Sequence, residues 1–333
     1  MMKMLLDIKI DEPEIKLDYR DGIMMMGSCF TEHIGDALHD LKFNVLQNPN
    51  GIIFDPSSVA SSLTSYIENK KYTEQDFFHL NELWQSWQHH SRFSGVDLSQ
   101  VIDTVNHSQQ HAHEFLKSAK WLIITLGTSY SYRLVEGGIP VANCHRAPQP
   151  WFNKHLMSID ETIIALDTCL YRLFQFNPDL KIIFTVSPVR HIRDGIINNN
   201  RSKARLLEAV HHLVNKFGRL YYFPSYEIVI DVLRDYRFYD IDLVHPNYAA
   251  TSYVIEEFMK HYVNEESIIL SKEVQQINIA RKHKPFQPTT DAHKRFLQLH
   301  AGKTLALMNA YPFLDLIKEL NYFEESQSPP SEG

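Results

Sequence analysis

The sequence predicts a doubly wound α/β fold, in which a mainly parallel β-sheet carries helices on both faces. Three short apolar runs, each ended by turn residues, support this prediction at 23–26, 121–126 and 182–186. Apolar runs without alternation are typical of strands buried on both faces of a parallel sheet. Segments with helical periodicity follow the runs. Ligands of such folds bind at the carboxyl ends of the strands, so residues just after each run are candidates for function.

The first run, Ile23-Met24-Met25-Met26, ends at Gly27-Ser28 and is followed at once by a helical pattern. The apolar residues of that pattern lie at i, i+4, i+7, i+8 and i+11, counted from Phe30. This spacing places them on one face of a helix. We therefore predict a strand, a tight turn and a helix over residues 23–41.

The other two runs have the same form. Residues 121–126 stop before Gly127, and residues 182–186 stop before Ser187-Pro188. Apolar residues at helical spacing predict further helices over 158–176, 203–217 and 248–262.

Two regions lie outside this alternation. Residues 63–115 are rich in aromatic, histidine and amide side chains, and we interpret them as a helical insertion between two core strands. Residues 1–262 would then form one domain and residues 263–323 a helical C-terminal appendage. The Ser/Pro/Gly/Glu-rich residues 324–333 are predicted to be disordered.

Composition excludes several classes of protein. The 333 residues hold 33 Lys and Arg against 40 Asp and Glu, a formal charge of −7, whereas nucleic-acid binding depends on a basic surface. Three cysteines are too few, and odd in number, for a disulfide framework, which favours a reducing compartment. No apolar stretch approaches the roughly 20 residues that span a bilayer, and charges interrupt residues 1–10 before a secretory signal can form. We expect a cytoplasmic protein that binds neither nucleic acid nor membranes.

Ser28 stands where the first predicted strand stops and the first helix begins. A hydroxyl at this place is presented at the edge of the sheet, and the N–H groups and dipole of the helix N-terminus favour a developing oxyanion. The alternative is that Ser28 only caps the helix, because serine is a preferred N-cap residue.

A second candidate is the loop Asp242-Leu243-Val244-His245-Pro246, just before the last helix. An aspartate three residues before a histidine can hold one ring nitrogen and stabilise the imidazolium. The alternative is a solvated loop with an adjacent carboxylate. Together with Ser28, however, these residues form one known arrangement of nucleophile, general base and orienting carboxylate.

The stretch Gly27-Ser28-Cys29-Phe30-Thr31 resembles the signature of the GSCFA family, with Thr31 in place of the alanine. Further blocks that resemble the family are residues 48–52 with Asp55-Pro56, residues 125–128, residues 187–191, and residues 235–239 leading into 242–246. That family resembles the SGNH/GDSL hydrolases. The resemblance implies a flavodoxin-like three-layer α/β/α sandwich, with Ser28 as nucleophile, His245 as general base and Asp242 as the residue that orients the histidine.

The resemblance also implies an oxyanion hole made by the N–H groups of Ser28 and Gly51 and by an asparagine side chain. No asparagine follows Gly127, where the wider superfamily usually has one. Ser129 stands in its place with Thr128 beside it, and either hydroxyl is a possible donor. Asn50 is an alternative donor or a substrate-binding residue.

Other polar residues raise weaker hypotheses. Arg190 and His191 follow a predicted strand and are candidates for binding an anionic part of a substrate, although a solvated loop is an equal alternative. Cys29 is expected in the core, because consecutive helix residues point about 100° apart and cannot both face the imidazole. His107 and His111 share a helix face, but no acidic or cysteine partner completes a zinc site, so no metal is expected.

These patterns together favour a serine esterase that forms an acyl-enzyme on Ser28 and needs no cofactor. The expected substrate is a small-molecule or saccharide ester, such as an acetyl ester. Two alternatives stay open: an O-acyltransferase acting on a saccharide, which would use the same residues, and a non-catalytic binding protein on the same scaffold.

Overall fold

The three apolar runs form neighbouring strands of one sheet in the computed structural model, which describes residues 6–325. The sheet has five strands in the order β10-β9-β5-β1-β2, and every neighbouring pair is parallel. The strands are β1 (Ile23–Gly27), β2 (Val45–Gln47), β5 (Trp121–Leu126), β9 (Lys181–Val186) and β10 (Leu220–Tyr222). Numbered along the chain within this sheet, the order is 2-1-3-4-5, as in flavodoxin-like folds. The predicted fold class is confirmed.

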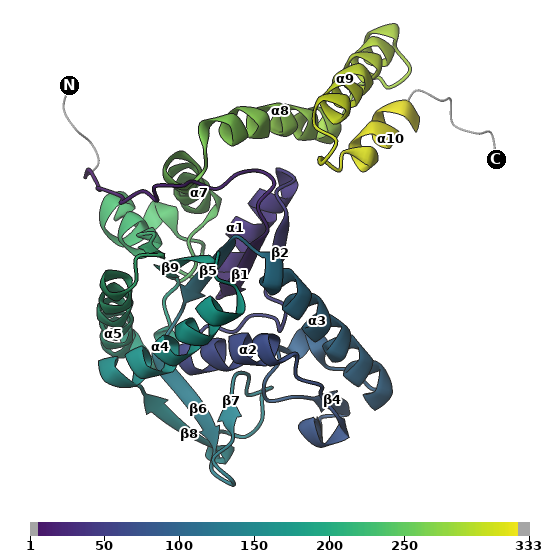
Figure 1. The fold of residues 1–333 in the computed structure, drawn as a ribbon. Helices are drawn as coiled ribbons and strands as arrows, with labels where there is room; N and C mark the ends of the chain where they lie inside the picture. The colour runs from purple at the N-terminus through teal and green to yellow at the C-terminus, as the bar shows by residue number, and fades with distance from the viewer. Residues whose placement is uncertain (1–5, 326–333) are drawn as a thin grey trace.

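Successive residues of each strand point to opposite faces of the sheet, so they pack into two different hydrophobic cores. In β1, Ile23 and Met25 lie in the first core, whereas Met24 and Met26 lie in the second. The first core contains α1 (Cys29–Asp40), α7 (Tyr248–Tyr262), and the π-helical turn Ile228–Leu233 that follows the short helix α6 (Ser225–Glu227). The second contains α2 (Pro56–Glu68), α3 (Leu98–Ser118), α4 (Ile159–Phe176) and α5 (Gly195–Lys216). Two helical layers therefore enclose the sheet (Figure 1).

The predicted helices are present, and local capping sets their first residues. Ser28 caps α1, and the Oδ1 atom of Asn247 accepts the Ala250 N–H at the start of α7. Ser158 and Glu161 form a capping box at the start of α4. Only α5 departs clearly from its predicted range, because it begins at Gly195 instead of residue 203.

The predicted insertion at 63–115 has a mixed structure. It holds the end of α2, a small antiparallel pair β3 (Phe78–Leu80) and β4 (Leu83–Gln85), and most of α3. Ala112 and Leu116 of α3 are fully buried in the second core. Helix α3 is therefore part of the layer that covers the sheet.

A second sheet follows the carboxyl end of β5 and was not predicted from the sequence. It is antiparallel, in the order β7-β6-β8. Its strands are β6 (Tyr130–Leu134), β7 (Pro140–Val141) and β8 (Phe152–Leu156). Short 3₁₀ helices cover Glu74–Asp76, Ser91–Phe93, Gln149–Trp151, Ile192–Asp194 and Tyr236–Phe238.

Three helices follow α7 and extend away from the sandwich (Figure 1). They are α8 (Glu265–Lys282), α9 (Asp291–Ala310) and α10 (Ile317–Glu325). From residue 326 on, the predicted disordered tail lies outside the described residues, as do the first five residues of the N-terminal stretch. Between residues 6 and 325, no helix combines the length and apolar character that crossing a membrane requires.

Candidate active site

Ser28 lies at the carboxyl end of β1, because Gly27 allows the chain to turn there. The φ angle of Gly27 is 144°, and a Cβ atom at this position would lie 2.2 Å from the Thr125 carbonyl oxygen. The Gly27 N–H donates to Oδ1 of Asn48 at 2.9 Å. The Ser28 Oγ accepts the Phe30 N–H at 3.3 Å, and the residue is only 4% exposed. Ser28 is therefore the N-cap of α1, at the point where the strand order of the sheet reverses.

Asp242 and His245 form a close pair in the loop before α7. Nδ1 of His245 lies 2.6 Å from Oδ2 of Asp242. The other carboxylate oxygen accepts the N–H groups of Val244 at 2.9 Å and His245 at 3.0 Å. The hydrogen bond to the His245 ring and those to the two N–H groups lower the pKa of Asp242 to about 2. The aspartate is thus ionised near neutral pH and fixes the orientation of the ring.

The Asp242 titration gives a testable prediction. Its pKa lies below the ordinary value of about 3.9, so the pair stabilises the folded state above about pH 4 and loses that contribution as the pH falls towards 2. In His245→Ala the pKa of Asp242 is expected to rise towards its ordinary value, because the largest cause of the shift is removed. Carboxyl ¹³C NMR titration of both proteins measures this. An ordinary pKa in the wild type would contradict the prediction.

The structure brings Asp242 to His245, but no hydrogen bond joins His245 to Ser28 in the part of the chain that it describes. The loop of His245 lies beside the carboxyl end of β9, because the Arg190 N–H donates to the Val244 carbonyl oxygen at 3.3 Å. The His245 side chain is 44% exposed. Nδ1 contacts Asp242, and no hydrogen bond of Nε2 is found within residues 6–325.

Three of the predicted oxyanion donors already have hydrogen-bond partners within the protein. The Gly51 N–H donates to the Asn48 carbonyl oxygen at 2.7 Å, and the Ser28 N–H donates to the Thr125 carbonyl oxygen at 3.2 Å. Ser129 is fully buried, and its Oγ lies 3.2 Å from Oγ of Ser202. These contacts occupy three of the donors that the sequence analysis proposed.

Thr128 differs from Ser129, because it lines the largest cavity described on this side of the sheet. That cavity has a volume of about 990 Å³ and is called the strand-end cleft below. Its wall includes Phe54, Asp55, His90, Thr128, Tyr130, Tyr132, His145, Arg146, Phe152, Lys154, Arg193 and Asp194. The loop after β5 therefore presents Thr128, and not Ser129, to an open space.

The second sheet supplies one wall of the strand-end cleft, and its residues were not among the predicted site residues. Nζ of Lys154 lies 4.3 Å from the ring centroid of Tyr130 and 5.6 Å from that of Tyr132. Lys154 also forms an ion pair with Asp194. Single aromatic and basic residues in short strands carry no signal of a shared cavity, so only the fold reveals the cleft.

A buried carboxyl group also lines the cleft. Asp55 caps α2 through a hydrogen bond from the Ser58 N–H, at 3.0 Å. Burial raises the pKa of Asp55 to about 6. The hydrogen bond that caps α2 offsets part of the cost of burying this carboxyl group.

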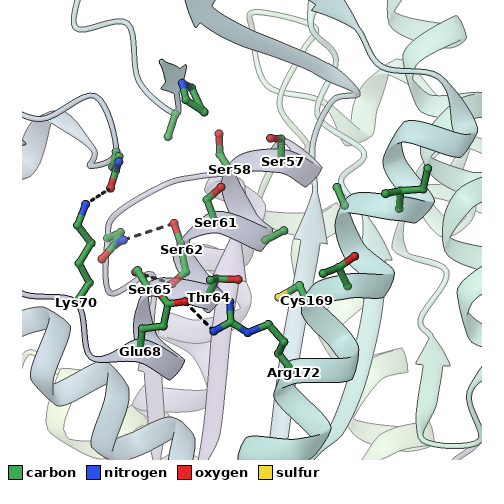
Figure 2. A pocket seen from close by; sticks show the side chains of 18 of the residues that line it. Ser57, Ser58, Ser61, Ser62, Thr64, Ser65, Glu68, Lys70, Cys169 and Arg172 are labelled. Carbon is green, nitrogen blue, oxygen red and sulfur yellow. Dashed lines mark hydrogen bonds and ion pairs between the residues drawn. The ribbon is translucent and has the colours of Figure 1, made fainter. Parts of the chain in front are cut away.

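Asn50 lies elsewhere. It is 1% exposed, and its Nδ2 lies 3.4 Å from Oγ of Ser62. It lines a separate cavity of about 490 Å³ between α2 and α4 (Figure 2). Hydroxyl groups of α2 line this cavity, and Glu68 and Arg172 form an ion pair of 2.7 Å beside it. Asn50 is thus not among the residues that line the strand-end cleft.

Arg190 and His191 follow β9, as predicted, but they face different neighbours. The ring of His191 packs 5.3 Å from that of Phe54, and burial lowers its pKa to about 4. The Arg190 guanidinium lies 5.8 Å from the ring centroid of Tyr239 and lines a cavity of about 510 Å³ next to Asp242. No salt bridge holds Arg190 among the described residues, so its charge is available to an anion.

The remaining candidates have packing contacts. Cys29 is half-buried against the first core, and burial raises the pKa of its thiol. The ring of His111 packs 6.3 Å from that of Phe115. No group of three or more metal-ligating side chains is found within residues 6–325.

Two comparisons give the relationship of the chain to known proteins. Residues 22–258 match a family described as the GSCFA family. Residues 274–327 match a family described as GSCFA domain protein, C-terminal domain. No curated protein matches the chain. The first match spans the sheet, the strand-end cleft and the Asp242–His245 pair, and the second lies in the C-terminal helices.

Proposed function

The chain belongs to the GSCFA family, and from this premise we propose that it is a serine esterase of the SGNH type, with Ser28 as nucleophile. The observation that carries the proposal is the Asp242–His245 pair, with a separation of 2.6 Å. Its loop is joined by the Val244 carbonyl oxygen to the Arg190 N–H just after β9, and Ser28 follows β1 at the same, carboxyl end of the parallel sheet. In this proposal Asp242 holds Nδ1 of His245, so that Nε2 is the nitrogen that serves as general base.

The reaction then proceeds in two halves. Ser28 Oγ attacks the acyl carbonyl carbon, its proton passes to Nε2 of His245, and the tetrahedral oxyanion collapses as the alcohol leaves with that proton. Water attacks the acyl-enzyme with His245 again as base, and the carboxylic acid and free Ser28 are released. His245 must approach Ser28 for this chemistry, and hydrogen bonds of empty active sites often form only when substrate binds.

Ser28 and His245 are not among the residues that line the strand-end cleft, so in this proposal the cleft holds the alcohol portion of the ester and favours a polar one. Its volume of about 990 Å³ exceeds what a short acyl group needs, and tyrosine, histidine, arginine and lysine side chains line it. A saccharide ester of a small acid fits these properties. We place the reaction in the cytoplasm, because the three cysteines are odd in number and all free, as is usual in a reducing compartment.

A fluorophosphonate probe tests the proposal directly, because it reacts covalently with an activated serine. We expect one adduct, at Ser28 by peptide mass spectrometry, and complete loss of labelling in Ser28→Ala. Ser158→Ala is the matched control, since Ser158 also accepts a hydrogen bond as the N-cap of a helix but lies at the start of α4. The control should lose a cap, worth about 1 kcal/mol, and keep its labelling.

The same experiment decides between the esterase and the non-catalytic binding protein. If the wild type is not labelled under conditions that label a known serine hydrolase, the esterase proposal fails. A binding protein on this scaffold then becomes the better explanation. Labelling that survives in Ser28→Ala would assign the reactive serine to another position.

A further inference from the structure

Lys203 is a buried lysine at the carboxyl end of the sheet. It is 1% exposed, and its Nζ donates to the carbonyl oxygens of Gly127 and Ser187, each at 2.6 Å. These two residues directly follow β5 and β9, two neighbouring strands of which β5 also pairs with β1. Lys203 thus ties together the loops that follow β5 and β9, and β5 is the strand whose Thr125 carbonyl oxygen accepts the Ser28 N–H.

No carboxylate pairs with Lys203 among the residues that the structure describes. Burying an ammonium group without a counter-ion is costly, and the group responds by losing its proton more easily. Burial lowers the pKa of Lys203 to about 7. The charged and titratable groups close enough to influence it are Cys29 on α1 and Arg190 and His191 after β9. A leucine or methionine would fill the same space at lower cost, so a role for the amine is indicated.

The hydrogen bond to Gly127 has a consequence for Thr128. The Gly127 carbonyl and the Thr128 N–H belong to the same peptide group. The ammonium group of Lys203, which donates to the carbonyl oxygen, therefore polarises the peptide and makes the Thr128 N–H a stronger donor. The two predicted backbone donors, the N–H groups of Ser28 and Gly51, are occupied, but the Thr128 N–H has no acceptor in the described part of the chain. Thr128 lines the strand-end cleft.

Ser202, the neighbour of Lys203 on α5, holds the same loop from its other side. The Ser202 Oγ accepts the Ser129 N–H at 2.7 Å and lies 2.9 Å from Oγ1 of Thr128. Two consecutive residues of α5 therefore fix both peptide groups that flank Thr128. The position of the Thr128 N–H is set before any ligand binds, as an oxyanion donor requires.

We propose that Lys203 is a positioning residue for the esterase reaction, and that it polarises the Gly127–Thr128 peptide so that the Thr128 N–H serves as an oxyanion donor. This inference rests on the proposed function. It assigns a donor to the loop that lacks the asparagine expected from the superfamily. It also makes the reaction depend on the charge of Lys203, which is present below about pH 7 and lost above it.

The rate of Ser28 labelling by a fluorophosphonate, measured from pH 5.5 to 9, tests this dependence. In the wild type the rate should fall towards high pH as Lys203 loses its proton. Lys203→Met should lower the rate at pH 6 by about 10- to 100-fold, because removal of an oxyanion donor typically costs about 10²–10³ and here the donor is only weakened. The falling limb should disappear.

Two variants accompany this measurement. Lys203→Arg keeps a charge that does not titrate in this range, so its rate should not fall above pH 7. Lys181→Met is the matched control: Lys181 begins β9 at the opposite end of the sheet, with its Nζ 5.3 Å from the Trp121 ring centroid. It should keep the wild-type profile. A wild-type rate and falling limb in folded Lys203→Met would overturn this inference and leave the proposed function intact.

NMR of the wild type provides a readout that needs neither activity nor a folded variant. One lysine ¹³Cε signal should titrate near pH 7, and the Thr128 amide resonance should shift with the same midpoint. If every lysine titrates above pH 9, or the Thr128 amide does not follow, the inference fails whatever the labelling shows. If these shifts occur but Ser28 is never labelled, the proposed function fails, and the oxyanion role of Thr128 fails with it.

Discussion

His245→Ala is expected to slow the labelling of Ser28 by a fluorophosphonate by about 10³-fold, within the range of about 10²–10⁴ for loss of a general base. The physical reason is that a serine hydroxyl is a weak nucleophile unless a base removes its proton as it attacks. The exposed His245 ring contributes little to the hydrophobic core, so the variant should remain folded. Rates from intact-protein mass spectrometry, with circular dichroism as the check on folding, measure the effect.

Asp242→Asn should produce a loss of similar size. The amide cannot stabilise the imidazolium, and it can hold the ring in the wrong tautomer; this change in another serine hydrolase costs about 10⁴. Asp240→Asn is the matched control, because Asp240 lies in the same loop and touches His245 only through its own N–H, which donates to the His245 carbonyl oxygen at 2.8 Å. Equal rates for the two variants would show that loss of charge in the loop, and not contact with the ring, is responsible.

Gly27→Ala is expected to destabilise the protein by about 2 to 6 kcal/mol, which combines backbone strain of about 1–3 kcal/mol with overpacking of about 1–3 kcal/mol. Its φ angle of 144° is unfavourable for alanine, and the added Cβ would lie 2.2 Å from the Thr125 carbonyl oxygen. Backbone on a neighbouring strand cannot move away without breaking the sheet between β1 and β5. Equilibrium unfolding in urea measures the loss.

Gly218→Ala is the control for this prediction. Gly218 has no atom within 4 Å of an added Cβ, and its φ is not in the positive range. Its stability should change by less than about 1 kcal/mol, since only the unfolded state is affected. If Gly27→Ala is as stable as Gly218→Ala, the turn that presents Ser28 is not constrained as the structure indicates.

The features that depend on residues close together in the chain could be predicted from the sequence. The apolar run before Gly27 and the helical spacing after it are enough to place Ser28 between a strand and a helix. Asp242 and His245 are three residues apart, so their contact requires only a local turn. Parallel strands must have their carboxyl ends at one edge of the sheet, and that rule predicts where ligands bind.

The strand order and the identity of the available donors were decided by the tertiary structure. Strands β2 and β10 have only three residues each and draw their stability from neighbours, so their own sequences give weak signals. Ser129 and Thr128 are indistinguishable as hydroxyl residues in the sequence, yet packing against Ser202 buries only Ser129 completely.

Lys203 is the clearest example of a residue whose environment could not be predicted from the sequence. In the sequence it is a polar residue at the start of a predicted helix, where lysines are normally solvated. Its carbonyl acceptors, Gly127 and Ser187, are 76 and 16 residues away along the chain. The sequence by itself therefore determined the fold class, the turn at Ser28 and the pairing of Asp242 with His245. The cleft, the free Thr128 N–H and the buried Lys203 were decided only by tertiary structure, because each requires contacts between distant segments whose burial no local pattern encodes.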